Sequence, residues 1–306
     1  MGIARRLLLR ASRSAFLARQ LRDRRFFRGA VRRFMPGEEL EDALRAAAEF
    51  GQAGIGTVLT ELGEQVTNRA EAEAVREHYL GVLDQIRQRG LPSEVSVKLS
   101  HLGLDIDPTW CLANVRALAA RAAERGGFLW VDMEESWYVD RTLALYRQVR
   151  AERANVGVAM QAYLRRTPAD VAALLPLKPT IRLVKGAYNE PPDVAFPRKA
   201  DTDAQYFALA EQLLEATKTG TRAVFGTHDL PLIRRIRERA VDLRVPSDRF
   251  EIHMLYGIKA RDQRALKSDG AKVSVLISYG HAWFAWYMRR LAERPANIWF
   301  VLRNLV

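Results

Sequence analysis

The chain has 306 residues, of which 48% are apolar, so it can bury a large core. Its single cysteine, Cys111, excludes an intramolecular disulfide and a cysteine-rich zinc site, and a reducing compartment such as the cytoplasm is expected. The five histidines lack the spacing of a zinc-binding helix, and no metal site is predicted. No run of about 18 apolar residues occurs, so no membrane-spanning helix is expected.

The net charge of +12 is concentrated in residues 1–35, which hold eleven arginines and a single acidic residue, Asp23. The rest of the chain is close to neutral, so a basic groove for nucleic acid is not predicted there. Leucines and phenylalanines lie between the arginines in a pattern compatible with amphipathic helices. The segment could bind anionic lipid, serve as an organellar transit peptide, or pack on the body with its arginines in water.

Pro36 and Gly37 interrupt the helical pattern after this basic arm. Residues 38–50 then predict a helix with acidic residues in its first turn, as the helix dipole favours. Residues 1–50 are therefore interpreted as a basic N-terminal helical arm with its following helix. Residues 51–306 are interpreted as one α/β body.

Beyond residue 50, apolar runs typical of buried parallel strands alternate with helical segments. The predicted strands are residues 54–59, 95–100, 128–133, 156–163, 181–185, 223–227, 250–255 and 272–277. The predicted helices are residues 71–88, 111–125, 139–150, 168–174, 204–218, 230–240, 262–267 and 282–294. This alternation predicts a (β/α)8 barrel over residues 51–306, with the final helix over its mouth and a doubly wound sheet as the alternative. Gly54 and Gly56 lack the third glycine and the acid of a dinucleotide fingerprint, which gives that alternative no support.

Polar residues gather where nearly every predicted strand ends, which is where ligands bind in a barrel of this class. They are Glu61 and Glu64; Lys98, Ser100 and His101; Asp132, Met133, Glu134 and Glu135; Gln161 and Tyr163; Arg182, Lys185 and Tyr188; Thr227, His228 and Asp229; His253 and Tyr256; and Ser278 and Tyr279. So many convergent polar groups predict an active site at the barrel mouth.

The fifth predicted strand carries two cations, Arg182 and Lys185, among branched apolar residues. It ends on Gly186 and Ala187, which let another molecule approach the backbone. A buried cation is costly unless it meets an anion or an acceptor, so the strand is interpreted as part of a ligand site. The alternative is a salt-bridged strand beside acidic helices.

The final helix presents Arg289, Arg290 and Glu293. Arginine pairs well with carboxylates, so both arginines with Lys98 are expected to hold a substrate carboxylate. No Ser-His-Asp arrangement stands out, so the chemistry is assigned to a bound cofactor. The alternatives are a Schiff-base aldolase that uses Lys185 or Lys98, and a lipid- or RNA-binding protein led by the basic arm.

Seven segments, spread from the second predicted strand to the C-terminus, resemble the flavin-dependent proline dehydrogenase family, in its monofunctional bacterial form. They are residues 95–100 (VSVKLS), 131–135 (VDMEE), 160–166 (MQAYLRR), 181–188 (IRLVKGAY), 225–228 (FGTH), 250–258 (FEIHMLYGI) and 289–297 (RRLAERPAN). No single segment is decisive, but the set in this order is specific.

The resemblance implies a distorted (β/α)8 barrel that binds FAD non-covalently. It implies oxidation of L-proline to Δ1-pyrroline-5-carboxylate, with a hydride passing from proline C5 to flavin N5 and electrons passing on to a membrane quinone. A pyrroline-5-carboxylate dehydrogenase is then expected downstream. The basic arm would be a peripheral contact at the inner face of the membrane.

The resemblance also assigns roles to individual positions. Asp132 and Arg182 match catalytic positions. Asp132 would orient the cations that hold the substrate carboxylate, which are Lys98, Arg289 and Arg290, and Arg182 would lie near flavin N5. The substrate positions are Lys98, Tyr188, Arg289, Arg290 and Glu293. The cofactor positions are Met133, Gln161, Lys185, Gly186, Ala187, Thr227 and His228. Glu64 resembles a gate residue that pairs with a final-helix arginine.

Three positions depart from the family pattern. Leu276 stands where a tyrosine usually covers the proline ring, on an alignment through Tyr279 and Gly280. His253 replaces a usual glutamine, and Asn189 replaces a frequent aromatic residue. The leucine implies weaker discrimination against a hydroxyl on the substrate ring, unless the register of the eighth strand differs.

Overall fold

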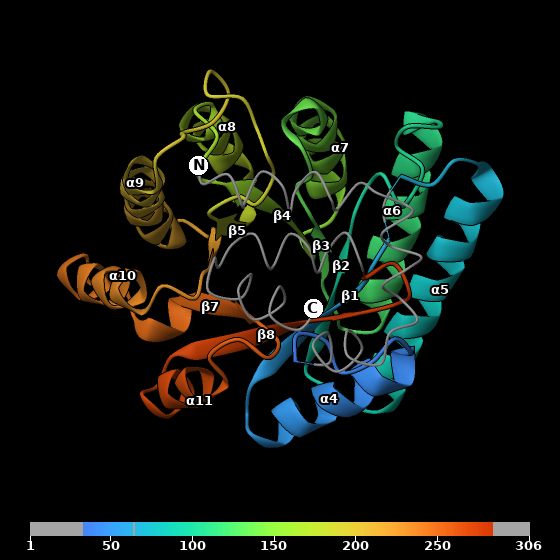
Figure 1. The fold of residues 1–306 in the computed structure, drawn as a ribbon, viewed down its shortest axis with the longest axis horizontal. Coiled ribbons are helices and arrows are strands. Elements are labelled where there is room, and N and C mark those ends of the chain that lie inside the picture. The colour runs from blue at the N-terminus through green and yellow to red at the C-terminus, as the bar shows by residue number, and fades with distance from the viewer. Residues whose placement is uncertain (1–32, 64, 284–306) are drawn as a thin grey trace, which may run out of the picture.

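The computed structural model describes residues 33–63 and 65–283. Its eight parallel strands form a closed barrel in sequence order, in which β8 pairs with β1 (Figure 1). The strands are β1 Gly56–Glu61, β2 Ser93–Val97, β3 Leu129–Val131, β4 Val156–Gln161, β5 Thr180–Val184, β6 Arg222–Gly226, β7 Phe250–Leu255 and β8 Lys272–Tyr279. The predicted (β/α)8 barrel is confirmed, and the doubly wound alternative is wrong because a doubly wound sheet is open.

Helices surround the barrel, as Figure 1 shows. They are α4 Leu40–Gln52, α5 Arg69–Gln88, α6 Pro108–Glu124, α7 Val139–Glu152, α8 Thr167–Leu174, α9 Lys199–Thr217, α10 Leu230–Asp242 and α11 Ala260–Ser268. Because helices cover the outside, the strands are buried on both faces, and every residue of β4 is buried. None of the helices within the described residues is long and apolar enough to cross a bilayer.

Side-chain caps determine where several of these helices begin. The Asn68 side chain accepts the backbone N–H of Glu71 at the start of α5, and Asp107 accepts those of Thr109 and Trp110 at the start of α6. Asp229 accepts the N–H of Leu232 at the start of α10. These caps satisfy backbone donors that have no partner inside the helix.

Strands β2 and β3 end earlier than the apolar pattern predicts, at Val97 and Val131. The predicted strand 95–100 thus begins two residues late and ends three residues late, and the predicted strand 128–133 is too long at both ends. After β2 the chain turns at once, with Leu102 and Leu104 donating to the Leu99 carbonyl. Asp132 still donates its backbone N–H to the Val97 carbonyl at 2.8 Å, so the two strand ends stay together. Their following residues therefore lie at the barrel mouth.

Three short 3-10 helices were not predicted: Ser136–Tyr138, Leu175–Leu177 and Ser247–Arg249. Helix α9 begins at Lys199, five residues before the predicted start. The basic arm of residues 1–32 and almost all of the predicted final helix lie outside the described residues.

Candidate active site

A buried ion pair joins three strand ends at the barrel mouth. Arg182 of β5 donates through Nη2 to Asp132, which follows β3, and to Ser96 Oγ of β2 at 2.9 Å. Ser96 Oγ also donates to Asp132 Oδ1 at 2.8 Å. The Arg182 side chain is only 4% exposed, so these contacts supply the anion that a buried cation needs. The structure thus brings two predicted catalytic positions, Asp132 and Arg182, into direct contact, a pairing not predicted from the sequence; their catalytic roles remain predictions.

The second terminal nitrogen of Arg182, Nη1, has no acceptor among residues 33–63 and 65–283. This nitrogen is also buried. A buried donor without a partner costs free energy, and in native proteins such groups usually meet a ligand or water. Arg182 therefore offers one charged N–H group to a bound molecule.

Whereas Arg182 has a buried donor, Gln161, at the end of β4, has a buried acceptor atom without a partner among the described residues. Its Nε2 atom donates to the carbonyl oxygens of Met133 at 3.4 Å and Glu134 at 3.2 Å. Its Oε1 atom is buried and lacks a partner among the described residues. The amide is thus held in orientation with its acceptor oxygen available, and a predicted cofactor position, Met133, holds it through its backbone.

Two carboxylates fasten the loops around this site. Glu134 accepts the backbone N–H of Ser100 at 3.0 Å and its hydroxyl at 2.5 Å. Glu190 accepts the backbone N–H of Ser136 at 2.8 Å and its hydroxyl at 2.6 Å. Both contacts join segments that follow different strands, so they stabilise the rim. Glu190 was not singled out from the sequence, because its partner is distant along the chain.

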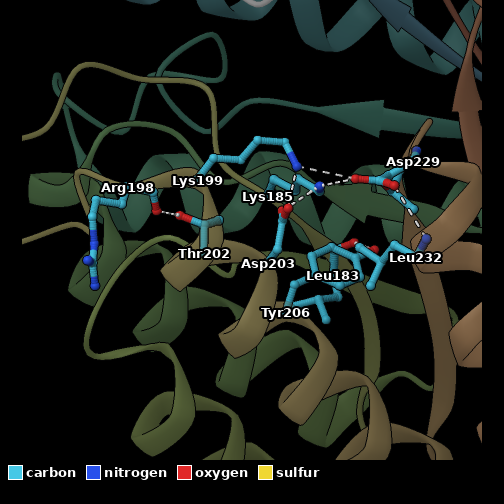
Figure 2. Close-up of polar contacts among 10 residues, drawn as sticks. Leu183, Lys185, Arg198, Lys199, Thr202, Asp203, Tyr206, Asp229 and Leu232 are labelled. Carbon is cyan, nitrogen blue, oxygen red and sulfur yellow. Dashed lines mark hydrogen bonds and ion pairs between the residues drawn. The ribbon is translucent and has the colours of Figure 1, made fainter.

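Lys185 lies at the outer edge of the mouth, between β5, α9 and α10 (Figure 2). Its Nζ atom is 2.6 Å from Asp203 Oδ1 and 2.8 Å from Asp229 Oδ2. Lys199 contacts the same two carboxylates, so two ammonium groups face two carboxylates. Burial raises the pKa of Asp229, but the hydrogen bond from Lys185 and its charge outweigh burial, so the net pKa is lowered. For Lys185, the alternative interpretation, a salt bridge to acidic side chains of the neighbouring helices, agrees with the structure. A contact between Lys185 and a cofactor remains a prediction.

Gly186 follows with a backbone φ of +107°, which favours glycine. A Cβ atom there would lie 2.1 Å from the Tyr163 ring. The group that approaches this backbone is therefore Tyr163 from the β4–α8 connection. This contact explains the glycine without a ligand, and the proposed cofactor contacts of Gly186 and Ala187 remain predictions.

The remaining predicted positions lie on the same rim where they are described. Thr227 Oγ1 accepts the backbone N–H of Asp229 at 3.2 Å, and His228 Nε2 accepts that of Leu255 at 3.3 Å. Lys98, which follows β2, and Tyr188, which follows β5, are partly buried. The gate residue Glu64 and the final-helix residues Arg289, Arg290 and Glu293 lie outside the described residues.

Two residues that depart from the family pattern, Leu276 and His253, have their side chains inside the barrel. Leu276 packs with Val58, Trp130 and Val224 inside the barrel, and its match to the family's tyrosine position remains a prediction. His253 also faces inward, with Nε2 3.4 Å from Glu251 Oε2. Burial lowers the pKa of His253, although Glu251 partly opposes that effect.

Trp130 was not singled out from the sequence, although it is fully buried directly beneath Arg182. The Arg182 guanidinium lies 4.8 Å from the centre of the Trp130 ring. The sequence could have indicated Trp130, because in a strand every second side chain faces the same way, so residues 128, 130 and 132 share the face that points into the barrel. A run that is apolar on both faces hides this alternation.

The proline dehydrogenase family model matches residues 43–303 of the chain. Proline dehydrogenase 1 of Bacillus subtilis (strain 168) is 36% identical over 277 residues, which cover 90% of each chain. Proline dehydrogenase of Deinococcus radiodurans is 37% identical over 279 residues, which cover 90% of this chain and 89% of that protein.

Solved structures show the same barrel. Proline utilization A from Bdellovibrio bacteriovorus, inactivated by N-propargylglycine, superposes with a TM-score of 0.80 at 22% identity, over 94% of this chain and 36% of that one. Proline utilization A from Bradyrhizobium japonicum, a D779W mutant, gives 0.71 at 25% identity, over 85% of this chain and 30% of that one. The chain thus spans about a third of those larger proteins. The family-model match and the similarity to the shorter bacterial enzymes show that the chain belongs to the proline dehydrogenase family of oxidoreductases.

Proposed function

We propose that this chain oxidises L-proline to Δ1-pyrroline-5-carboxylate with FAD as its cofactor. The observation that carries the proposal is the Arg182–Asp132–Ser96 contact at the barrel mouth of a proline dehydrogenase family member. It supplies a buried guanidinium whose orientation is determined on one side and whose second nitrogen is available.

The described residues fit a flavin. An isoalloxazine ring presents acceptor atoms and an N–H donor along one edge, and Arg182 Nη1 and Gln161 Oε1 are a buried donor and a buried acceptor without partners in the described chain. When bound, FAD would supply the hydride acceptor for proline C5. Arg182 would stabilise negative charge that develops on the cofactor, since a fixed cation in a water-poor site needs no reorganisation.

The substrate would be held by its carboxylate. Lys98 lies after β2, close in sequence to the Ser96 position that contacts Arg182. Arg289 and Arg290 would complete the clamp, with Glu293 and Tyr188 beside the ring and Glu64 closing the entrance. An arginine guanidinium can bind a carboxylate through two parallel hydrogen bonds, which fixes the orientation of the bound group.

The chain would act within a short sequence of reactions. Electrons would leave for a membrane quinone, and the arginines of residues 1–35 would attach the protein to anionic lipid. A pyrroline-5-carboxylate dehydrogenase would consume the product. No nucleic-acid partner is proposed, because the charge outside the arm is nearly balanced.

The absorbance spectrum of the purified protein tests the proposal. We expect flavin bands that bleach when proline is added without oxygen. Arg182→Ala should slow bleaching by about 100-fold, as expected when an oriented electrostatic group is lost, while the thermal midpoint changes less. A protein without flavin bands even after FAD is added would refute the proposal.

A Schiff-base aldolase is the less favoured alternative. Such enzymes desolvate their lysine or place it near another cation. Lys185 has the Lys199 ammonium nearby, but both groups contact the same two carboxylates, which balance their charge, and Lys185 is only partly buried. Borohydride reduction in the presence of substrate should therefore leave Lys185 unlabelled.

Leu276 supports a variation of the same chemistry, with 4-hydroxyproline as a second substrate. Its side chain lies inside the barrel and carries no hydroxyl that could distinguish a substituted ring. We expect the ratio of kcat/KM for proline over 4-hydroxyproline to rise by about tenfold in Leu276→Tyr, the effect of roughly one polar or steric contact. A wild-type preference for proline by several orders of magnitude would refute relaxed specificity.

A further inference from the structure

The barrel interior beneath the active site is charged. In this fold the interior is usually filled by layers of branched apolar side chains. Here Arg222 pairs with Glu94 at 2.7 Å and with Glu251 at 2.7 Å, and Lys272 contacts Glu251 at 3.0 Å. Of these groups only Glu251 is buried, with 3% of its side chain exposed, whereas Glu94 and Arg222 are 22% and 27% exposed and Lys272 is 56% exposed. A buried carboxylate is costly unless it is paired, and Glu251 has both cations as partners.

Trp130 connects this charged layer to the active site. Its Nε1–H group donates to Glu94 Oε2 at 2.5 Å. The ring centre lies 4.8 Å from the Arg182 guanidinium and 5.4 Å from that of Arg222. His253 meets the ring edge-on at 5.7 Å and 72°. The indole is thus oriented from below by a carboxylate and is in contact with the guanidinium above it.

Arg182 needs such support because its hydrogen bonds restrain only one end of the group. Both bonds come from Nη2, to Asp132 and Ser96. The side chain holds Nε covalently and the hydrogen bonds hold Nη2, so the planar group can still rotate about the line through these two atoms and carry Nη1 away from the mouth. An aromatic face against the guanidinium removes this freedom, since the contact is favourable only over the ring.

We propose that Trp130 is a positioning residue that holds the free Nη1 of Arg182 toward the cofactor, with Glu94 orienting the indole. The inference rests on the proposed function. The Nε1 bond distinguishes tryptophan from phenylalanine here: a phenyl ring would keep an aromatic face but lose the contact that sets its plane.

The test uses the FAD-loaded protein with Trp130→Leu and Trp130→Phe, each also combined with Arg182→Met. The limiting rate of flavin bleaching at saturating proline, the KM for proline, and the midpoint potential of bound FAD are measured. Trp130→Leu should slow bleaching about tenfold or more, because misplacing an oriented group by about 1 Å can cost 100-fold. Trp130→Phe should give a smaller loss in the same direction.

The midpoint potential should fall in Trp130→Leu, because a displaced cation stabilises the reduced cofactor less. In the Arg182→Met background, Trp130→Leu should change the limiting rate of flavin bleaching by less than twofold and should leave the midpoint potential unchanged. The reason is that two substitutions acting through the same residue are not additive. Phe128→Leu is the matched control: Phe128 contacts Trp130 and Arg222, and its loss should leave both quantities near wild type.

Equal losses in the two backgrounds, or an unchanged potential in Trp130→Leu, would overturn the inference. If Trp130→Leu does not fold, the same comparison with Trp130→Phe decides. Wild-type protein that fails to bleach with proline would instead refute the proposed function, so the two failures are distinguishable.

Discussion

His253 is a buried histidine next to a buried carboxylate, and it links stability to pH. Its ring contacts Glu251 and lies near Arg182 and Glu94, which act on its charge in opposite directions. Burial is the largest influence, and the pKa of His253 is lowered from 6.5. In the unfolded chain this histidine binds a proton near its ordinary pKa. Acid below that value therefore favours the unfolded chain.

His253→Gln should make stability less sensitive to acid. Between pH 7 and pH 5.5, the free energy of unfolding of the wild type should fall by about 1 kcal/mol more than that of the variant, within the limit of 1.36 kcal/mol per pH unit for one proton. Urea unfolding at several pH values measures both. Parallel curves would show that His253 titrates alike in the folded and unfolded chain.

Gly186 is required by both its backbone angle and the Tyr163 ring. Gly186→Ala should lower the free energy of unfolding by about 2 kcal/mol or more, since it adds backbone strain to a steric overlap. Gly81→Ala is the control, because nothing lies within 4 Å of a Cβ atom at this position of α5. That variant should be more stable by about 0.5–1 kcal/mol. Equal effects measured by denaturant titration would contradict the argument.

At the scale of elements, Asp229 makes two kinds of contact: it caps α10, and it pairs with lysines at the end of β5 and the start of α9. Its Oδ1 atom caps α10 through Leu232, and its Oδ2 atom takes the ammonium groups of Lys185 and Lys199 (Figure 2). Asp203 holds the same ammonium groups from α9. The junction therefore ties the end of β5 to the beginnings of two helices.

Two substitutions separate these two kinds of contact. Asp229→Asn keeps a capping oxygen but removes the charge, whereas Asp229→Ala removes both. We expect Asp229→Ala to cost about 1 kcal/mol more in unfolding free energy than Asp229→Asn, the usual contribution of a cap. Thermal and urea unfolding of both variants provide the measurement. Indistinguishable variants would mean that the cap contributes nothing here.

At the scale of the whole molecule, most of the net positive charge lies in residues 1–35, before the helices and strands of the barrel. Helix α4 packs against β1 and β8, the two strands whose pairing closes the barrel. Glu38 accepts hydrogen bonds from Trp283 Nε1 at 2.8 Å and contacts His281 Nδ1 at 2.9 Å. Met35 is also buried. Residues 35–52 therefore belong to the folded body, while most of the net charge precedes them.

Removing residues 1–32 should affect membrane attachment and spare catalysis. Binding to vesicles with anionic lipid should fall at least tenfold, because each arginine near such a surface contributes about 1 kcal/mol. Turnover with a water-soluble dye acceptor should stay within twofold. Sedimentation with anionic and neutral vesicles at two salt concentrations gives the measurement. Equal binding by both forms would remove lipid contact from the proposal.

The sequence by itself determined the barrel, because eight apolar runs alternating with amphipathic helices leave few other ways to bury both faces of a parallel sheet. It also predicted that Asp132, Gln161 and Arg182 gather at the mouth, since strand ends converge there. Only the tertiary structure decided what each group contacts. The Asp203–Lys185–Asp229 contacts, the Tyr163–Gly186 contact and the Trp130 ring beneath Arg182 join residues from different strands and helices. Such contacts depend on which side chains face each other after the barrel closes, and spacing along one chain carries no measure of that.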